Sequence, residues 1–413
     1  MAKIKAFQGV RPAADKIKVV ASRPYDVLNS AEARVEVKGN PDSFLHVVKP
    51  EVDLPEDIDL YTEAVYQKGR ENLYGMIERG VLVQDEKPAL YIYQQIMGNV
   101  NQIGLVAGTS IEDYENDIIK KHEHTRANKE ADRIKHVDTL NANTGPVFLT
   151  YPAREDINKI VAEEMKNTPV YDFEAEDGIK HIFWVISDAE KIEKLTAIFS
   201  EIEYLYVADG HHRSASGTKV GQRRRAANPN HTGEEEYNYF LSVIFPHDQL
   251  YIMDYNRVVK DMNGHSVEEF LQMVEEKFDL EKIGAEPVQP TKLHSFGMYV
   301  DGNWYQLTAK DGSFPATDPV KSLDVSILQE NLLTPILAIG NPRTDERIDF
   351  VGGIRGLKEL SNRVEAGEAV AFSMFPTSIE QLMNIADAGE VMPPKSTWFE
   401  PKLRSGVITH LLD

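Results

Sequence analysis

Apolar and polar positions follow one another along the chain in short blocks that predict both strands and helices. Strands are expected where branched and aromatic residues stand together, in segments 89–93, 103–107, 181–186, 204–208, 239–245 and 370–374. Helical spacing and terminal signals predict helices over 57–80, 112–136, 189–200, 211–228, 266–278 and 324–338, and from 377 to a stop at Gly389. Residues 1–50, including 44–48, are expected to form short strands and turns. This alternation predicts an α/β fold, or a mixed α+β fold.

Two of the expected helices begin with residues that favour helix starts. Thr109 or Ser110 can cap the helix over 112–136. Thr377 and Glu380 stand three apart and predict a capping box.

The second half of the helix over 112–136 has almost no large apolar residue. A helix of that kind is either fully solvated or lines a polar cleft.

Length and composition indicate a globular protein of two domains. A chain of 413 residues is too long for one small core, and 42% apolar with 27% charged residues is typical of folded proteins. The polar, turn-rich stretch 228–236 is the expected boundary, between residues 1–230 and 231–413. No apolar run is long enough for a membrane span, and the N-terminus lacks the apolar core of a signal peptide. We therefore expect a cytoplasmic protein that does not associate with membranes.

Cysteine content and charge exclude several classes of function. Because there is no cysteine, disulfides, thiolate zinc sites, iron–sulfur clusters and cysteine nucleophiles are all excluded. The formal net charge of -21 repels a phosphate polymer, so broad nucleic-acid binding is not expected. A local basic pocket for one small anion is compatible with this charge. The sequence does not specify an oligomeric state.

The sharpest chemical feature is the stretch YVADGHHRSA, in which an apolar strand meets a helix. Gly210 permits a tight turn, and the free N–H groups and dipole of the following helical turn form an anion site. Arg213 adds a planar fork suited to phosphate oxygens, and His211 and His212 can donate hydrogen bonds or act as acid or base. Asp209 suits holding a histidine tautomer, or a magnesium ion that bridges to phosphate. In the purely structural alternative, Asp209 caps the helix and the histidines pack under a loop.

A second feature is the stretch HEHTR, which falls within the helix expected over 112–136. On that helix His122, Arg126, Lys129 and Arg133 would share one cationic face that could meet phosphates across a cleft. Glu123 is offset by one position and could serve as a general base. The structural alternative is a solvent-exposed helix that carries many charges.

Two further stretches contain candidate binding residues. In MPPKSTWFEPK, two prolines stiffen the approach to Lys395, Ser396 and Thr397, whose donors could close over a ligand phosphate. The alternative is a rigid surface loop. RPYDV, at residues 23–27, is either part of the site or an ordinary turn.

The ordered set RPYDV, HEHTR, ADGHHR and MPPKSTWFEPK resembles a widespread family of uncharacterised bacterial proteins, and the resemblance covers nearly the whole chain. The chain departs from that family at Arg23, where proline is more frequent, and at Ser214-Ala215, where an aromatic residue is common. DGHHR is also similar to the motif of the free serine kinases of the ParB/sulfiredoxin superfamily. This second resemblance is short and local. It implies a ParB/sulfiredoxin-like core over 1–230, with a second α/β domain over 231–413.

The resemblance to the serine kinases implies a small-molecule kinase that uses a nucleotide, ATP or ADP, and Mg²⁺ to phosphorylate a hydroxyl such as that of free serine. The matching turn binds nucleotide phosphates in that superfamily, so Gly210 and Arg213 are expected to hold the transferring phosphate and Asp209 to hold Mg²⁺. Glu123 is the candidate base that takes the substrate proton. Lys395 is expected to neutralise the charge that develops on the phosphoryl oxygens.

Two alternatives belong to other functional classes. One is a nucleotide-binding regulatory module without turnover, and the other is a metal-dependent hydrolase built on the histidines. A zinc site at His122 and His124 is not favoured, because residues two apart on a helix point to opposite sides and the HExxH spacing is absent.

Overall fold

A computed structural model describes residues 1–413, which form two compact units. Unit 1 comprises Met1–Leu250 and Pro401–Asp413, and unit 2 comprises Tyr251–Glu400. The boundary expected at residue 230 falls inside unit 1, because the next strand, β12 (Tyr239–Pro246), is hydrogen-bonded between two strands of the unit 1 sheet. Periodicity along the chain does not reveal that the last residues return to the first unit, because that return depends on pairing between distant segments.

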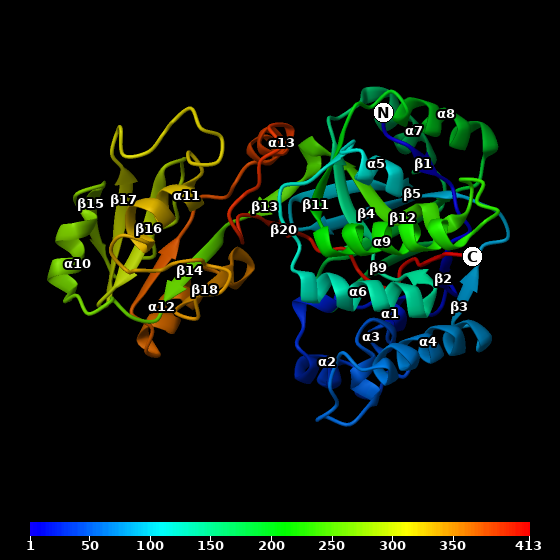
Figure 1. The fold of residues 1–413 in the computed structure, drawn as a ribbon, viewed down its shortest axis with the longest axis horizontal. Helices are drawn as coiled ribbons and strands as arrows, with labels where there is room; N and C mark the ends of the chain where they lie inside the picture. Colours follow the sequence, from blue (N-terminus) through cyan, green and yellow to red (C-terminus); the bar gives the residue numbers. More distant parts are fainter. The chain divides into compact units, whose positions relative to one another are not determined.

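Unit 1 is built on a nine-stranded mixed sheet (Figure 1) with the order β6-β11-β8-β12-β5-β4-β10-β9, and β1 pairs with β5. Pairing is antiparallel except between β11 and β6 and between β12 and β8. The strands of unit 1 are β1 (Ile4–Lys5), β2 (Val10–Pro12), β3 (Leu82–Gln84), β4 (Leu90–Met97), β5 (Val100–Ser110), β6 (Ile119–Lys120), β7 (Ala142–Asn143), β8 (Val147–Tyr151), β9 (Tyr171–Glu174), β10 (Lys180–Ile186), β11 (Leu205–Asp209), β12 and β21 (His410–Leu411).

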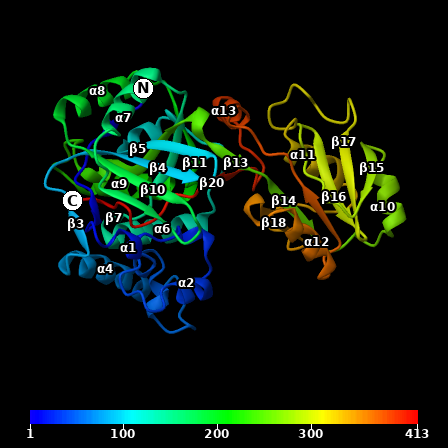
Figure 2. The same ribbon diagram turned by 180° about the vertical axis from the view of Figure 1, so that it is seen from behind.

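The helices of unit 1 pack around this sheet. They are α1 (Ile17–Val20), α2 (Ser30–Glu36), α3 (Leu45–Val48), α4 (Glu63–Glu78), α5 (Ile111–Glu115), α6 (Ala127–Leu140), α7 (Glu155–Glu164), α8 (Ala189–Phe199) and α9 (His211–Ala227), with short 3₁₀ turns η1 (Tyr25–Val27), η2 (Pro50–Asp53), η3 (Glu236–Asn238) and η4 (His247–Gln249). Buried residues of α7 and α8 join the core of the sheet. Helix α9 lies against β12, with α6 beside it and α4 beyond α6 (Figures 1 and 2).

Small residues allow α9 to approach the sheet closely. A Cβ atom added at Gly217 would lie 3.0 Å from Phe240 Cβ, and one added at Gly221 would lie 2.3 Å from the Tyr237 carbonyl oxygen. Ser214, one turn earlier, is completely buried. Positions 214, 217 and 221 repeat at helical spacing and therefore share the face that meets β12. This close packing fixes where the N-terminus of α9 lies relative to the end of β11.

Unit 2 is built on an antiparallel sheet of order β15-β17-β16-β19-β14-β18. Its strands are β13 (Tyr251–Met253), β14 (Tyr255–Val259), β15 (Phe278–Gly284), β16 (Ser295–Val300), β17 (Asn303–Ala309), β18 (Ile348–Gly352), β19 (Val370–Ser373) and β20 (Trp398–Glu400). Its helices are α10 (Val267–Val274), α11 (Asp324–Leu328), the π-turn η5 (Gln329–Leu333), the 3₁₀ turn η6 (Gly353–Arg355), α12 (Leu357–Glu365) and α13 (Ile379–Asp387).

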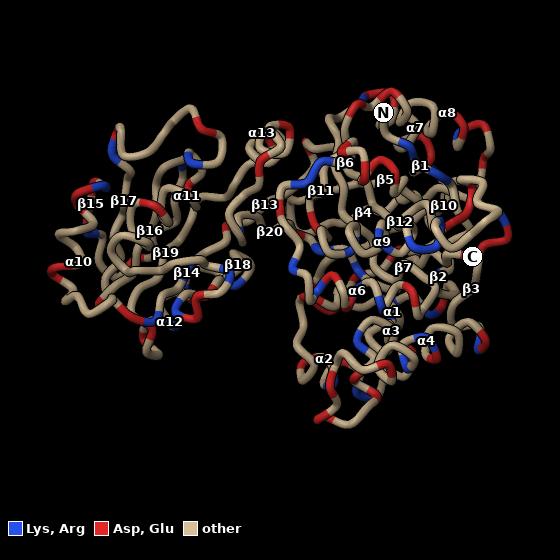
Figure 3. The backbone as a smooth tube through the Cα atoms, in the orientation of Figure 1, with Lys and Arg blue, Asp and Glu red and all other residues tan.

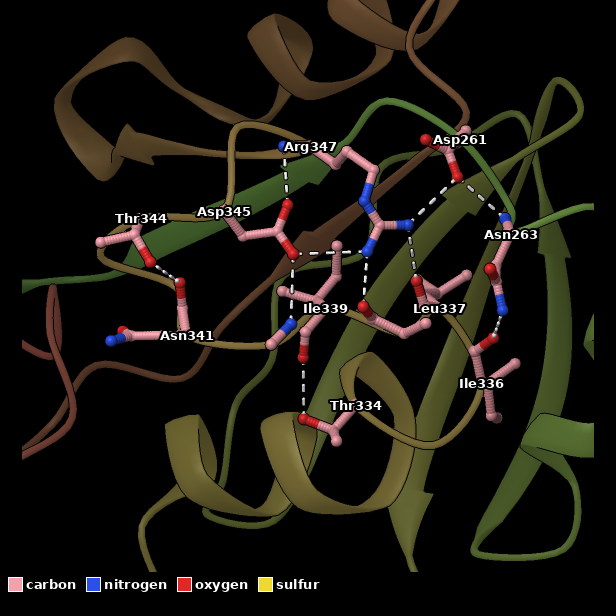
Figure 4. A network of polar contacts seen from close by, with 12 residues as sticks. Asp261, Asn263, Thr334, Ile336, Leu337, Ile339, Asn341, Thr344, Asp345 and Arg347 are labelled. Atoms are coloured by element: carbon pink, nitrogen blue, oxygen red, sulfur yellow. Dashed lines mark hydrogen bonds and ion pairs between the residues drawn. The ribbon is translucent and has the colours of Figure 1, made fainter.

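Arg347 holds the long connection between η5 and β18 in unit 2 (Figure 4). Its Nη1 donates to the Leu337 carbonyl at 3.1 Å and lies 3.5 Å from an Asp261 oxygen. Its Nη2 lies 3.3 Å from Asp345, which also accepts the Arg347 backbone N–H at 3.0 Å. One guanidinium thus satisfies a loop carbonyl that would otherwise need water.

The architecture confirms the expected α/β class, and strands cover all six segments where strands were expected. The helix expected over 112–136 is wrong: α5 ends at Glu115, β6 follows, and α6 begins at Ala127. Pairing of β6 with β11 extends the chain there, because tertiary pairing outweighs local helix propensity. Segment 44–48 is mostly the helix α3, and the box at α13 joins Ser378 to Gln381, one residue beyond the expected pair.

Charged residues of both signs are interspersed through both units (Figure 3). None of the helices combines the length and the apolar character that a bilayer crossing requires.

Buried histidines should make folding sensitive to acid. His136 is 2% exposed, and its Nε2 lies 3.1 Å from the Val47 carbonyl oxygen. Burial, helped by the charge of Arg133, lowers the pKa of His136 from 6.5 to about 3. Between these values the unfolded chain binds a proton that the folded chain does not. The stabilisation is therefore complete above pH 6.5 and is lost as the pH falls toward 3, by about 1.4 kcal/mol per pH unit.

We expect His136→Gln, which keeps a donor for Val47, to reduce this pH dependence. In urea denaturation, the free energy of unfolding of the wild type should fall from pH 7.5 to pH 5.0 by about 2 kcal/mol more than that of the variant. Equal losses in the two proteins would show that His136 does not carry the effect.

Candidate functional site

The turn between β11 and α9 leaves the N-terminus of a 17-residue helix without a side-chain cap. Gly210 is the N-cap residue and has φ +97°, a left-handed conformation that favours glycine. A Cβ atom at this position would also lie 3.0 Å from Arg213 Nε. Two constraints therefore require glycine here. The first-turn N–H groups and the positive end of the helix dipole can receive an anion.

Asp209, the last residue of β11, lies between two cations. Its Oδ2 accepts a hydrogen bond from Lys402 Nζ at 3.1 Å and lies 3.6 Å from Arg213 Nη2. Burial by itself favours the neutral acid, but the charges of Lys402 and Arg213 outweigh it and hold the pKa of Asp209 well below its ordinary value. The carboxylate is therefore ionised at neutral pH and lies between two cations.

Lys402 reaches this cluster because two buried glutamines hold the returning chain. Gln95 Nε2 donates to the Lys402 carbonyl at 2.9 Å, and Gln102 Nε2 donates to the Pro401 carbonyl at 3.3 Å. Gln102 also donates to Gln95 Oε1 at 2.9 Å, and both side chains are completely buried. Adjacent strands β4 and β5 thus fix the backbone from which the Lys402 side chain extends.

Arg213 is a buried guanidinium with donors that no protein atom accepts. Its Nη1 donates to the Pro146 carbonyl, whereas its Nε is buried without a hydrogen-bond partner. Its Nη2 lies 3.6 Å from Asp209 and 3.8 Å from Asp26, beyond hydrogen-bonding distance. Burial opposes the charge, but Asp26 and Asp209 raise the pKa of Arg213 above its ordinary value. The fork is therefore charged, and part of it is free to bind a ligand.

Two neutral imidazoles lie beside the turn. The rings of His122 and His211 meet edge to face at 4.4 Å, and the residues are 3% and 7% exposed. Burial, reinforced by His211, lowers the pKa of His122 far below its ordinary value, and burial lowers the pKa of His211 to about 4. His122 Nδ1 and His211 Nε2 are buried without hydrogen-bond partners. Unpaired polar atoms of this kind are costly in a folded protein and are typical of sites that receive a ligand.

The HEHTR stretch meets the turn as an extended loop rather than as a helix face. The Arg126 backbone N–H donates to His212 Nε2 at 3.0 Å, so His212 accepts at that nitrogen. Burial and His211 lower the pKa of His212, and the negative charge of Glu123 opposes this shift. Glu123 therefore lies within electrostatic reach of the turn. The side chains of Arg126 and Lys129 are exposed, and the cationic face expected on a helix does not form.

A small pocket lies beside Arg213. Its volume is about 30 Å³, which is room for roughly two water molecules. It is lined by Pro24, Tyr25, Val48, Arg133, His136, Val137, Asn143, Thr144, Gly145, Val147, Arg213, Ser216 and Ser405. The RPYDV turn therefore contributes to the site through Tyr25, and also through Asp26 near Arg213.

The donor set does not fit a resident magnesium ion at Asp209, contrary to the expectation from the sequence. Lys402 and Arg213 already occupy the surroundings of its carboxylate, and a divalent cation there would be repelled by both. Nowhere in the chain do three His, Asp or Glu side chains gather in a way that could hold a metal ion.

RPYDV, HEHTR and ADGHHR, three of the four stretches selected from the sequence, lie in unit 1. The fourth stretch, MPPKSTWFEPK, is divided between unit 2 and unit 1. Lys395, Ser396 and Thr397 belong to unit 2. There the Lys395 carbonyl accepts from Arg257 at 3.1 Å, and the buried Ser396 hydroxyl donates to the Pro393 carbonyl at 2.6 Å. The sequence analysis did not select Lys402, although this lysine ends the stretch MPPKSTWFEPK, and it did not place Arg133 in a pocket. Both depend on contacts between distant segments.

Several solved structures resemble this chain at low similarity. A free serine kinase in complex with AMP is 15% identical with a TM-score of 0.33, and the match covers 68% of this chain and 84% of that chain. A mutant free serine kinase in complex with ADP is 16% identical with a TM-score of 0.34 and the same coverage. SbnI with a C-terminal truncation, from Staphylococcus aureus, is 10% identical with a TM-score of 0.34, and the match covers 73% and 85%. Similarity at this level assigns no function.

No curated protein matches the sequence. A family of unknown function does match, over residues 4–326, which include the turn at Gly210 and all of HEHTR and RPYDV. Because this match spans most of the chain, the protein belongs to the family described as Protein of unknown function (DUF1015).

Proposed function

We propose that this protein binds the phosphates of a nucleotide at the turn between β11 and α9 and transfers a phosphoryl group to the hydroxyl of a small molecule such as free serine. The observation that carries the proposal is the uncapped helix start behind Gly210, next to the two cations Arg213 and Lys402. Helix dipole, free N–H groups and a partly unpaired guanidinium together favour a phosphate over any neutral group. The short resemblance of DGHHR to the free serine kinases agrees with this chemistry.

The roles in the proposed reaction follow from position. Arg213 and the first-turn N–H groups hold the transferring phosphate, and Lys402 neutralises charge on its oxygens. We assign this last role to Lys402 rather than Lys395, because Lys402 Nζ lies 3.1 Å from Asp209 in the motif. Asp209 orients Lys402 and Arg213 and holds no metal in this scheme.

Glu123 acts as the base in the proposed transfer. It takes the proton of the acceptor hydroxyl, whose oxygen then bonds to the terminal phosphorus. The bond between that phosphorus and its bridging oxygen breaks, and the electron pair leaves with the shortened nucleotide. The two buried imidazoles of His122 and His211, neutral at pH 7, offer hydrogen bonds without adding charge.

Replacing Lys402 should weaken nucleotide binding. Lys402→Gln removes a charge-assisted contact to phosphate, so we expect the affinity for ATP or ADP to fall roughly tenfold or more. Isothermal titration calorimetry measures the change. Lys159→Gln is the matched control, because this lysine is on the surface and 73% of its side chain is exposed. Lys395→Gln should also leave the affinity unchanged; a loss confined to Lys395→Gln would return the role to Lys395.

Replacing Glu123 should abolish turnover without affecting binding. Glu123→Gln keeps shape and hydrogen bonding but removes basicity, so transfer of labelled phosphate from ATP or ADP to serine should fall roughly a hundredfold or more. Nucleotide affinity should stay at the wild-type value, because the carboxylate does not contact phosphate. Glu163→Gln, on the exposed surface, is the control. A wild type that binds nucleotide tightly but forms no product would contradict a kinase and favour a regulatory nucleotide-binding module.

A further inference from the structure

Unit 2 contains a buried arginine that has no acidic partner. Arg257 lies in β14, is 3% exposed and forms no ion pair with a carboxylate. Arg404, which is 8% exposed, pairs with Asp177. Burial lowers the pKa of Arg257 from 12.5 to about 10, and only Tyr255 opposes this shift. The guanidinium is therefore still charged at neutral pH, and burying it without a counter-charge is costly.

Acids that neighbour Arg257 along the chain or across the sheet have other partners. The Asp254 carboxylate accepts a hydrogen bond from Asn256 Nδ2 at 2.5 Å. Asp349, on the adjacent strand β18, lies 2.8 Å from Arg363 Nη2. The chain carries a net charge of -21, yet no carboxylate of the protein supplies the counter-charge for this buried cation.

A second cation, Lys395, belongs to a loop that Arg257 holds in place. Arg257 Nη2 donates to the Lys395 carbonyl at 3.1 Å, and Lys395 has φ +59°, a left-handed conformation that is uncommon for a residue with a side chain. Ser396 Oγ donates to the Pro393 carbonyl at 2.6 Å, and Thr377 Oγ1 donates to the Ser396 carbonyl at 2.9 Å. The backbone of Lys395 is therefore fixed from both sides. Strain that the surrounding structure maintains in this way is typical of a functional site.

Tyr255 is the residue at which the two cations meet. Lys395 Nζ lies 5.5 Å from the centroid of the Tyr255 ring, and Arg257 Nη1 donates to the Tyr255 carbonyl. The Lys395 side chain is exposed and forms no ion pair. Arg257 Cζ also lies 5.4 Å from the centroid of the Phe350 ring, which helps to hold the guanidinium in place. Because two carbonyls use only part of the guanidinium's donors, N–H groups of Arg257 remain for a ligand.

We propose that Arg257 and Lys395 form a binding site in unit 2 for one small oxyanion, the hydrogen phosphate dianion. The charge of a dianion balances the two cations, and an arginine fork beside a lysine point charge is a combination that suits phosphate oxygens. Arg257 is 3% exposed, so only a small anion can reach it. The site consists of unit 2 residues alone. It goes beyond the proposed function and does not depend on it.

The test is calorimetric titration of the full chain with inorganic phosphate at about pH 8 and constant ionic strength. Lys395→Gln changes an exposed side chain and keeps the hydrogen bonds of the loop, so it should fold and weaken phosphate binding roughly tenfold or more. Arg257→Gln, which keeps a donor for the Lys395 carbonyl, should weaken it at least as much. Lys282→Gln is the matched control and should bind phosphate like the wild type, because this exposed lysine is on β15, at the opposite edge of the sheet from β18.

A second set of titrations separates this site from the turn at Gly210. The same variants are prepared with Lys402→Gln, which weakens the turn, so that the phosphate still bound is bound in unit 2. We expect Lys395→Gln to reduce this remaining binding by the same factor as before. Acetate, which has a single negative charge, should bind roughly tenfold or more weakly than phosphate. Binding of ADP is measured in parallel.

Each outcome decides the inference separately from the proposed function. Wild-type phosphate affinity in Lys395→Gln overturns the unit 2 site, and so does acetate that binds as tightly as phosphate. Phosphate binding that only Lys402→Gln reduces also overturns it and leaves the proposed function standing, as does a wild type that binds ADP but no phosphate. Phosphate binding that Lys395→Gln weakens, in a protein that does not bind ADP, supports the unit 2 site and counts against the proposed function.

Discussion

The ionised carboxylate of Asp209, held between Lys402 and Arg213, is the interaction on which the arrangement of unit 1 depends. It joins three parts of the chain: the end of β11, the first turn of α9 and the segment that returns after unit 2. Two cations gathered at one place repel each other, and taking them out of water is costly. One carboxylate between them offsets much of that cost. The uncapped first turn of α9 beside these cations is what makes the turn receptive to an anion.

Packing and backbone geometry hold the turn in a conformation in which several buried polar atoms have no hydrogen-bond partner. The small residues of α9 bring the helix close to β12, so its N-terminus cannot shift to find a cap. Gly210 accepts a left-handed conformation that a side chain would resist. Arg213 Nε, His122 Nδ1 and His211 Nε2 stay buried without partners. Polar atoms left unpaired in this way destabilise the folded protein, and a bound ligand that pairs with them would recover that stability.

Carboxylates compensate both arginines near the turn. Asp209 and Asp26 approach the Arg213 guanidinium, though neither is within hydrogen-bonding distance. Arg133 is neutralised by its neighbour Asp132. Arg213 also donates to the Pro146 carbonyl. A planar guanidinium has donors in several directions, which is a physical reason for an arginine at position 213 rather than a lysine.

The sequence by itself determined the local structure around the candidate site. The apolar run 204–208 and the glycine after Asp209 specify a strand, a tight turn and a helix start, and all three are present. These features depend on neighbouring residues alone, so periodicity and backbone preference are enough to find them. The tertiary structure decided which distant groups meet that turn. Lys402, 193 residues away from Asp209, reaches it because Gln95 and Gln102 anchor a returning segment. The HEHTR stretch became a loop because β6 pairs with β11, which no helical spacing can reveal. Contacts of this kind depend on pairing across the whole fold, and a linear pattern carries no information about that pairing.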